Sequence, residues 1–306
     1  MRELNLAKGY RALAAAIIIS VFGNGALAQD APRIVTVNYP LQYFAERLVG
    51  DAAEVVFPVP EGVDPSFWRP SISDISAVQS ADLILLNGAG FATWVDRVSL
   101  PRARLVDTSR SLEDQFIVTE SITHSHGDGG AHSHEGLASY TWLDPTLAIA
   151  QAEAVAAALT VRDLAPAGEI ETRLGTLRAE LGALDTKARA DLSAAQGVAM
   201  IATHPRYQYL ARRYDLSIAS LEWEAGAEPT ADEWEELDAL MKETGARILI
   251  WEGVPPAAAL EAAEALGVEN VVFETLAHKP SNGSYVDALG AAIAALSDVA
   301  RHWPGN

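Results

Sequence analysis

Residues 166–194, PAGEIETRLGTLRAELGALDTKARADLSA, carry an unusually long helical pattern. Apolar residues recur along it at steps of three or four, which places them on one face of an α-helix. A helix of about 28 residues is roughly 42 Å long, enough to cross a whole lobe of a protein. A separate coiled coil is the alternative, but a new apolar run begins directly afterwards, at Val198. We therefore expect a rigid helix joining two lobes, with an apolar face of Ile170, Leu174, Leu177, Leu181, Leu184, Ala188 and Leu192.

Short apolar runs alternate with helical segments on both sides of this helix, as in parallel sheets covered on both faces. Before it, we expect strands at 33–38, 54–59, 82–87, near Leu105 and at 115–119, and helices at 39–49, 71–80 and 145–159. After it, we expect strands at 198–203, 247–251 and 270–273, and helices at 205–214, 230–244, 255–266 and about 284–301. The pattern predicts an α/β fold of two doubly wound parallel-sheet lobes, 29–165 and 195–306, joined by one long backbone helix, 166–194.

The first 28 residues predict a secretory signal peptide. A basic start precedes an apolar run at 12–22, and Ala26-Leu-Ala28 is a typical cleavage site, although an uncleaved anchor is the alternative. Cleavage leaves 278 residues, enough for two domains or one large one. The chain has no cysteine for a disulfide or for attachment of a lipid. We expect a free periplasmic protein.

The composition is strongly acidic, with 41 Asp and Glu against 22 Lys and Arg, a formal net charge of −19. Removing the signal, whose net charge is +2, leaves −21. Such a charge repels nucleic acid and anionic membranes and attracts cations over long range. Solubility alone explains it equally well.

Four of the seven histidines lie within eleven residues, interleaved with glycine, serine and acidic residues. A run of this composition is typical of a metal-attracting loop, because neutral imidazole is a common ligand of zinc and similar ions. A solvated linker is the alternative. The predicted ligands in this segment are His124, His126, His132 and His134.

Two expected strand ends also carry side chains that can bind metal. Ligands of open α/β sheets bind just beyond the carboxyl ends of strands. His204 follows the strand expected at 198–203, and Glu274 follows the one at 270–273. An imidazole and a carboxylate together suit zinc, manganese or iron(II). A lone histidine there is more often structural, but the two positions together predict a metal site.

A series of short motifs runs in order along nearly the whole mature chain. They are VNYPL (37–41), GVDP (62–65), ADLILLNGAG (81–90), the histidine-rich segment, WLDP (142–145), the long helix, TH (203–204) and AEPT (227–230). Each is weak alone. In this combination the chain resembles the metal-specific solute-binding proteins of ABC transporters, the ZnuA-like zinc binders and their manganese relatives.

The resemblance implies two α/β lobes joined by one long helix, with a metal ion held by four ligands in a cleft between the lobes. The ligand after Gly-x-Asp-Pro, usually histidine, is here Ser66, and a second histidine, two residues before Trp-Leu-Asp-Pro, is here Tyr140. The third ligand matches His204, and the fourth, usually aspartate, matches Glu274. Neutral hydroxyls are poor zinc ligands, since a phenol has an ordinary pKa of about 10.

Three interpretations follow for the cleft. In the first, His204, Glu274, Tyr140 and water hold the metal, and the histidine-rich segment supplies imidazoles. In the second, the cleft takes a harder or larger ion, or a metal chelate. Residues 67–69, Phe-Trp-Arg, then either face an organic chelator or simply pack into the cleft. In the third, metal binding has been lost and the protein binds another exported protein.

The predicted function is that of a periplasmic solute-binding protein. It captures a divalent metal, zinc first with manganese or iron as alternatives, and as a monomer delivers it to an ABC permease in the inner membrane. The alternative is a divergent relative that binds a metal chelate or a protein partner. We expect no enzyme, because the chain has no Gly-x-Ser-x-Gly, His-Glu-x-x-His or phosphate-loop motif. Gly88-Ala-Gly90 is not a dinucleotide fingerprint, since residue 93 is threonine.

Overall fold

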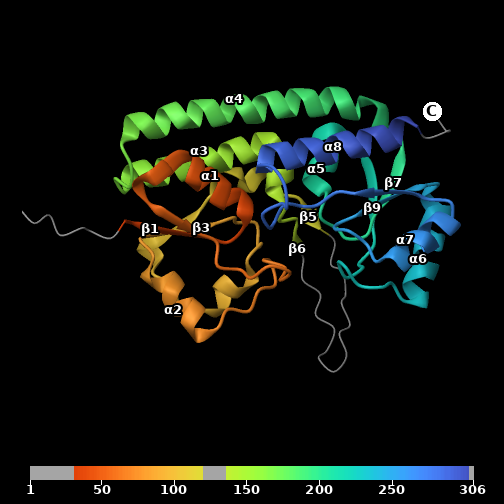
Figure 1. Ribbon diagram of the computed structural model, residues 1–306, viewed down its shortest axis with the longest axis horizontal. Coiled ribbons are helices and arrows are strands. Elements are labelled where there is room, and N and C mark those ends of the chain that lie inside the picture. The colour runs from red at the N-terminus through yellow and green to blue at the C-terminus, as the bar shows by residue number, and fades with distance from the viewer. Residues whose placement is uncertain (1–30, 120–135, 303–306) are drawn as a thin grey trace, which may run out of the picture. The chain divides into compact units, whose positions relative to one another are not determined.

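Two four-stranded parallel sheets carry the fold shown in Figure 1. The computed structural model describes residues 31–119 and 136–302. The first sheet has the order β2-β1-β3-β4, with β1 at Arg33–Thr36, β2 at Glu54–Val56, β3 at Leu83–Leu86 and β4 at Leu105–Asp107. The second has the order β10-β9-β7-β8, with β7 at Ala199–Ala202, β8 at Ser217–Ser220, β9 at Ile248–Trp251 and β10 at Glu269–Val272. The predicted α/β class with two parallel sheets is confirmed.

Helices follow the strands in both lobes. The first lobe carries α1 (Tyr39–Val49), α2 (Ile72–Ser80) and α3 (Pro145–Val161), and the second carries α5 (Gln208–Tyr214), α6 (Ala231–Thr244), α7 (Ala257–Ala265) and α8 (Tyr285–Arg301). Short 3₁₀ turns lie at Gly50–Ala52, Thr93–Arg97, Arg102–Arg104, Arg110–Gln115, Thr141–Leu143 and Leu192–Ala195. Several helix starts are fixed by the side chain of the preceding residue. Asp144, for example, accepts a hydrogen bond from the Thr146 amide at the start of α3.

The long helix is α4, Ala167–Asp191. It packs against α1 and α3 at one end and against α8 at the other, and Figure 1 shows it running alongside both α3 and α8. The apolar face predicted from the spacing is buried along its length, from Ile170 to Leu192. The long helix is therefore confirmed, while the domain boundaries at 165 and 194 stay a prediction.

The segment that follows β10 ties the two lobes together, and the described residues from 31 onward form one compact unit. The Trp142 indole N–H donates to the Thr275 carbonyl over 2.7 Å, and the Tyr39 amide donates to the Ala277 carbonyl over 2.9 Å. The Tyr285 hydroxyl donates to the Trp142 carbonyl over 2.5 Å. Both partners of each of these hydrogen bonds are buried. One lobe can therefore move against the other only if these bonds break or if the bonded residues move together.

Two strands differ from the sequence-based expectation. β8, Ser217–Ser220, was not predicted, because its small and polar residues give no apolar run and it lies at a sheet edge. The strand predicted at 115–119 is only Val118–Thr119 (β5), which pairs antiparallel with Gly136–Leu137 (β6) outside the main sheet. Within the described ranges, no helix has both the length and the apolar character that crossing a membrane requires.

Candidate metal centre

Three candidate ligands stand at neighbouring strand ends of the second sheet. His204 follows β7, Glu252 follows β9 and Glu274 follows β10. Since the sheet order is β10-β9-β7, Glu252 lies on the strand between the other two. Parallel strands end at one edge, so all three residues project from the same edge of the sheet.

His204 is held in a tautomer suited to metal binding. Its Nδ1 lies 2.7 Å from the carbonyl oxygen of Trp223. A carbonyl only accepts, so Nδ1 carries the proton and Nε2 keeps a free lone pair. Burial, and after it the charge of Arg206, lowers the pKa of His204, which keeps the imidazole neutral near pH 7. A histidine oriented through its second nitrogen is the usual arrangement in metal sites.

The backbone after His204 makes a tight turn instead of starting the predicted helix. The Arg206 amide donates to the His204 carbonyl over 2.9 Å, and α5 begins only at Gln208. Tyr207 anchors the turn, because its hydroxyl donates to the Phe273 carbonyl over 2.6 Å. The turn leaves Arg206 buried between the two lobes.

The Arg206 guanidinium contacts both lobes. Its Nη2 donates to Asp64 Oδ2 of the first lobe over 2.8 Å, and its Nε lies 3.5 Å from Glu252 Oε1 of the second. Its Cζ is 4.7 Å from the centre of the Tyr140 ring and 5.8 Å from that of Phe67. Burial opposes its charge, but Tyr140, Glu252 and Asp64 outweigh that effect and raise the pKa of Arg206. We call Asp64, Ser66, Tyr140, His204, Arg206 and Glu252 the interlobe site.

The two hydroxyl residues at predicted ligand positions both lie in the interlobe site. Ser66 is buried, and its hydroxyl and amide donate to Asp64 Oδ1 over 2.6 and 2.8 Å. Tyr140 is buried against Phe91 and Trp142. Burial raises the pKa of Tyr140 well above its ordinary value, so its hydroxyl stays a neutral phenol at neutral pH.

Two further residues of this site, Glu252 and Asp64, were not predicted from the sequence. The Glu252 side chain is 12% exposed, and its partial burial raises the pKa of the carboxyl group against the opposing effect of Arg206. Its place after the apolar run 248–251 was a signal of the same kind that pointed to His204. Asp64 belongs to the Gly-Val-Asp-Pro motif. From the resemblance, the ligand position was expected two residues later, at Ser66.

The other predicted ligands are placed differently. Glu274 is exposed, and the described part of the chain offers it no hydrogen bond or ion pair. His124, His126, His132 and His134 lie outside the described residues. Within residues 31–119 and 136–302, no three His, Cys, Asp or Glu side chains are grouped closely enough to hold a metal ion. The carboxylates and the imidazole of the interlobe site are instead arranged around a guanidinium.

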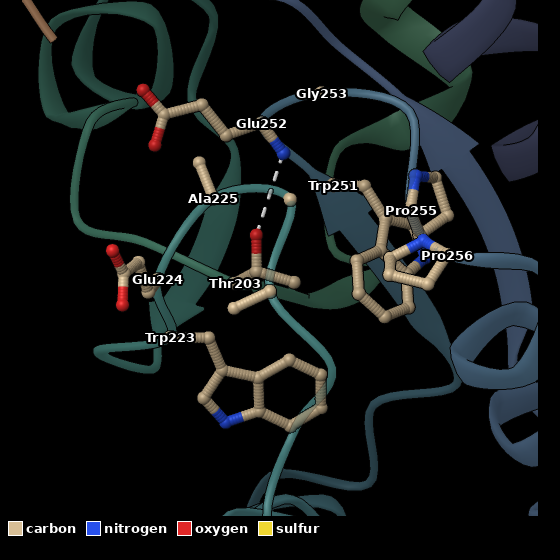
Figure 2. Close-up of a pocket in the computed structure, with 11 residues that line it drawn as sticks. Thr203, Trp223, Glu224, Ala225, Trp251, Glu252, Gly253, Pro255 and Pro256 are labelled. Atoms are coloured by element: carbon tan, nitrogen blue, oxygen red, sulfur yellow. Dashed lines mark hydrogen bonds between the residues drawn. The ribbon is translucent and has the colours of Figure 1, made fainter. Parts of the chain in front are cut away.

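Two hollows adjoin this region. Figure 2 shows the smaller one, about 10 Å³, between Thr203, Trp223 and Trp251, where the Glu252 amide donates to Thr203 Oγ1 over 3.3 Å. The Glu252 carboxylate points away from the Trp251 ring there, and the space fits one water molecule at most. The larger hollow, about 240 Å³, is lined by Phe67, Trp68, Arg69, Pro70, Thr93, Trp94, Arg97 and Val98.

Comparisons with known proteins agree with the fold. The family described as zinc-uptake complex component A, periplasmic, matches residues 34–299. The high-affinity zinc uptake system protein ZnuA of Bacillus subtilis is 26% identical over 282 residues, 88% of each chain. The zinc-binding lipoprotein AdcA of Streptococcus pneumoniae is 27% identical over 85% of this chain, which spans only 53% of that relative.

A solved structure with the same fold is the metal-dependent lipoprotein YcdH of Bacillus subtilis. It superposes with a TM-score of 0.73 at 23% identity, covering 88% of this chain and 99% of that one. The family match extends over both sheets and α4 and includes every residue of the interlobe site. The chain therefore belongs to the family of the periplasmic component A of zinc-uptake complexes, which are metal-binding solute-binding proteins of ABC transporters and not enzymes.

Proposed function

We propose that this protein captures a divalent metal ion, zinc first, at the interlobe site and delivers it to an ABC permease in the inner membrane. It acts in the periplasm as a monomer. The observation that carries the proposal is His204, whose Nδ1–H bond to the Trp223 carbonyl leaves Nε2 free for a metal. Family membership supports transport as the role.

The proposed ligands are one imidazole and two carboxylates, His204, Asp64 and Glu252, which have to draw closer together around the ion than they lie in this structure. This set suits zinc, and also manganese or iron(II), with water completing the coordination. Both carboxylates already contact a cation, the Arg206 guanidinium, so their surroundings accept positive charge. Glu274 and Tyr140 remain predicted contributors from their positions, and His124 to His134 remain a predicted low-affinity store.

A zinc titration tests the proposal. The chain beginning at Gln29, freed of metal, should bind at least one zinc ion in a calorimetric titration, and elemental analysis of protein purified without chelator should find zinc. No heat with zinc, manganese or iron would contradict the proposal. Deletion of residues 124–134 separates the two sites, because the interlobe site should remain while any weaker binding disappears.

A second candidate is capture of an anionic metal chelate. The 240 Å³ hollow combines the aromatic rings of Phe67 and Trp94 with the cations of Arg69 and Arg97, which is unusual in so acidic a chain. Aromatic faces and guanidinium groups together suit a flat, anionic organic ligand. In the same titration, heat with zinc citrate but none with free zinc would favour this candidate.

A further inference from the structure

We infer that Arg206 is a tethered cation that occupies the metal position of the interlobe site, so that an incoming metal ion must displace it. The inference rests on the proposed function and adds a residue that sets affinity. The guanidinium is surrounded by the residues that a metal would contact, with Asp64 at 2.8 Å, Glu252 at 3.5 Å and the Tyr140 ring at 4.7 Å.

The substitutions at the two other ligand positions fit this arrangement. Ser66 and Tyr140 stand where the resemblance expects imidazoles, and neither competes with a guanidinium. The Ser66 hydroxyl donates to Asp64 Oδ1, which leaves Oδ2 of the same carboxylate for Arg206. The Tyr140 ring presents a face to the guanidinium, a favourable contact for a desolvated cation.

The positive charge of Arg206 opposes the binding of a second cation at the interlobe site. Arg206 is buried, and its guanidinium contacts both proposed carboxylate ligands, Asp64 and Glu252. A divalent ion bound by these carboxylates would meet the fixed positive charge of the guanidinium, in buried surroundings where solvent screens charge poorly. Displacement of the guanidinium removes this repulsion and frees both carboxylates for the metal.

Arg206 also holds the lobes together without a metal. Asp64 belongs to the first lobe, and Arg206 and Glu252 belong to the second. The Nε of Arg206 makes no hydrogen bond in the described structure, and its ion-pair contact with Glu252 Oε1 is long, at 3.5 Å, so the guanidinium is incompletely satisfied. A buried donor that makes no hydrogen bond is costly, which favours exchange of this side chain for a better-matched ion.

The test is Arg206→Gln, which keeps a polar side chain and removes the charge. Zinc affinity should rise at least about tenfold, because the variant no longer has the positive charge that repels zinc from the two carboxylates. Arg206→Lys keeps a cation and should stay near the wild type. Arg213→Gln is the matched control, because it removes an ion pair with Asp185 outside the interlobe site.

A double variant shows where the gain arises. Arg206→Gln combined with His204→Ala should lose the gained affinity, because the gain belongs to a site that contains His204. If Arg206→Gln unfolds, Arg206→Met takes its place. The measurement is then the rise in Tm on adding zinc, which should be larger for the variant than for the wild type.

The outcomes separate the inference from the proposed function. Zinc binding that depends on His204 but is unchanged or weaker in Arg206→Gln would overturn the inference and leave the function standing. Zinc binding by Arg206→Gln alone would support the inference and contradict the function. Absence of binding in every variant would overturn both.

Discussion

Replacing His204 by alanine is expected to lower the zinc affinity of the interlobe site by at least about 10- to 100-fold, the usual cost of losing even an outer partner of a metal ligand. His204 is the single neutral nitrogen donor among the described residues of this site, and its Nδ1–H bond to Trp223 fixes its orientation. Two carboxylates and water without it make a harder site, of the kind that suits magnesium, calcium or manganese.

The measurement is a competitive titration against a zinc chelator of known affinity. His302→Ala is the matched control, because His302 also bonds a carbonyl, that of Asp298, but is exposed at the end of α8. The lowered pKa of His204 also predicts how zinc binding depends on pH. Protons should begin to compete with zinc at a lower pH than for a free histidine. Equal zinc affinities of His204→Ala and the wild type would show that zinc binds elsewhere.

Replacing Trp142 by alanine should lower the free energy of unfolding by about 3–5 kcal/mol, as for other large buried side chains. The side chain is fully buried, packs against Phe91 and Tyr140, and donates its indole N–H to the Thr275 carbonyl of the other lobe. The variant loses packing and also leaves that carbonyl without its partner.

Urea denaturation measures the change, with Trp142→Phe as the comparison. Phenylalanine keeps an aromatic ring but loses the donor and part of the indole volume, so its cost should be smaller, about 1–3 kcal/mol, chiefly that of an unsatisfied buried acceptor. A loss below about 1 kcal/mol for the alanine variant would mean that this contact between the lobes contributes little to stability.

The architecture could be predicted because its signals are local. The α4 stripe repeats at helical spacing from Ile170 to Leu192, and the buried strands are continuous apolar runs such as 83–86 and 248–251. β8 lacked such a run because an edge strand buries less apolar surface. The start of α5 was predicted three residues too early, since Pro205 suits a first helical turn but here lies in the turn that positions Arg206.

The candidate site was harder to predict because its central residue is not a metal ligand. His204 stands at a strand end and was found by position. Arg206 has no signal of its own in the sequence, since the significance of a cation depends on the residues from elsewhere that surround it. The contact of Arg206 with Asp64 joins residues 142 positions apart, and only the packing of the two lobes brings them together. The replacements Ser66 and Tyr140 were visible in the sequence, but the guanidinium that lies over the Tyr140 ring and bonds Asp64 was not.

Zinc and the Arg206 guanidinium are expected to compete for one position between the lobes. Diffraction at the zinc absorption edge, from crystals of the zinc-loaded chain, locates the bound ion. We expect an anomalous peak beside His204 Nε2, with Asp64 and Glu252 turned to the metal and the Arg206 side chain moved away. A peak confined to residues 124–134, with Arg206 still bonded to Asp64, would contradict it.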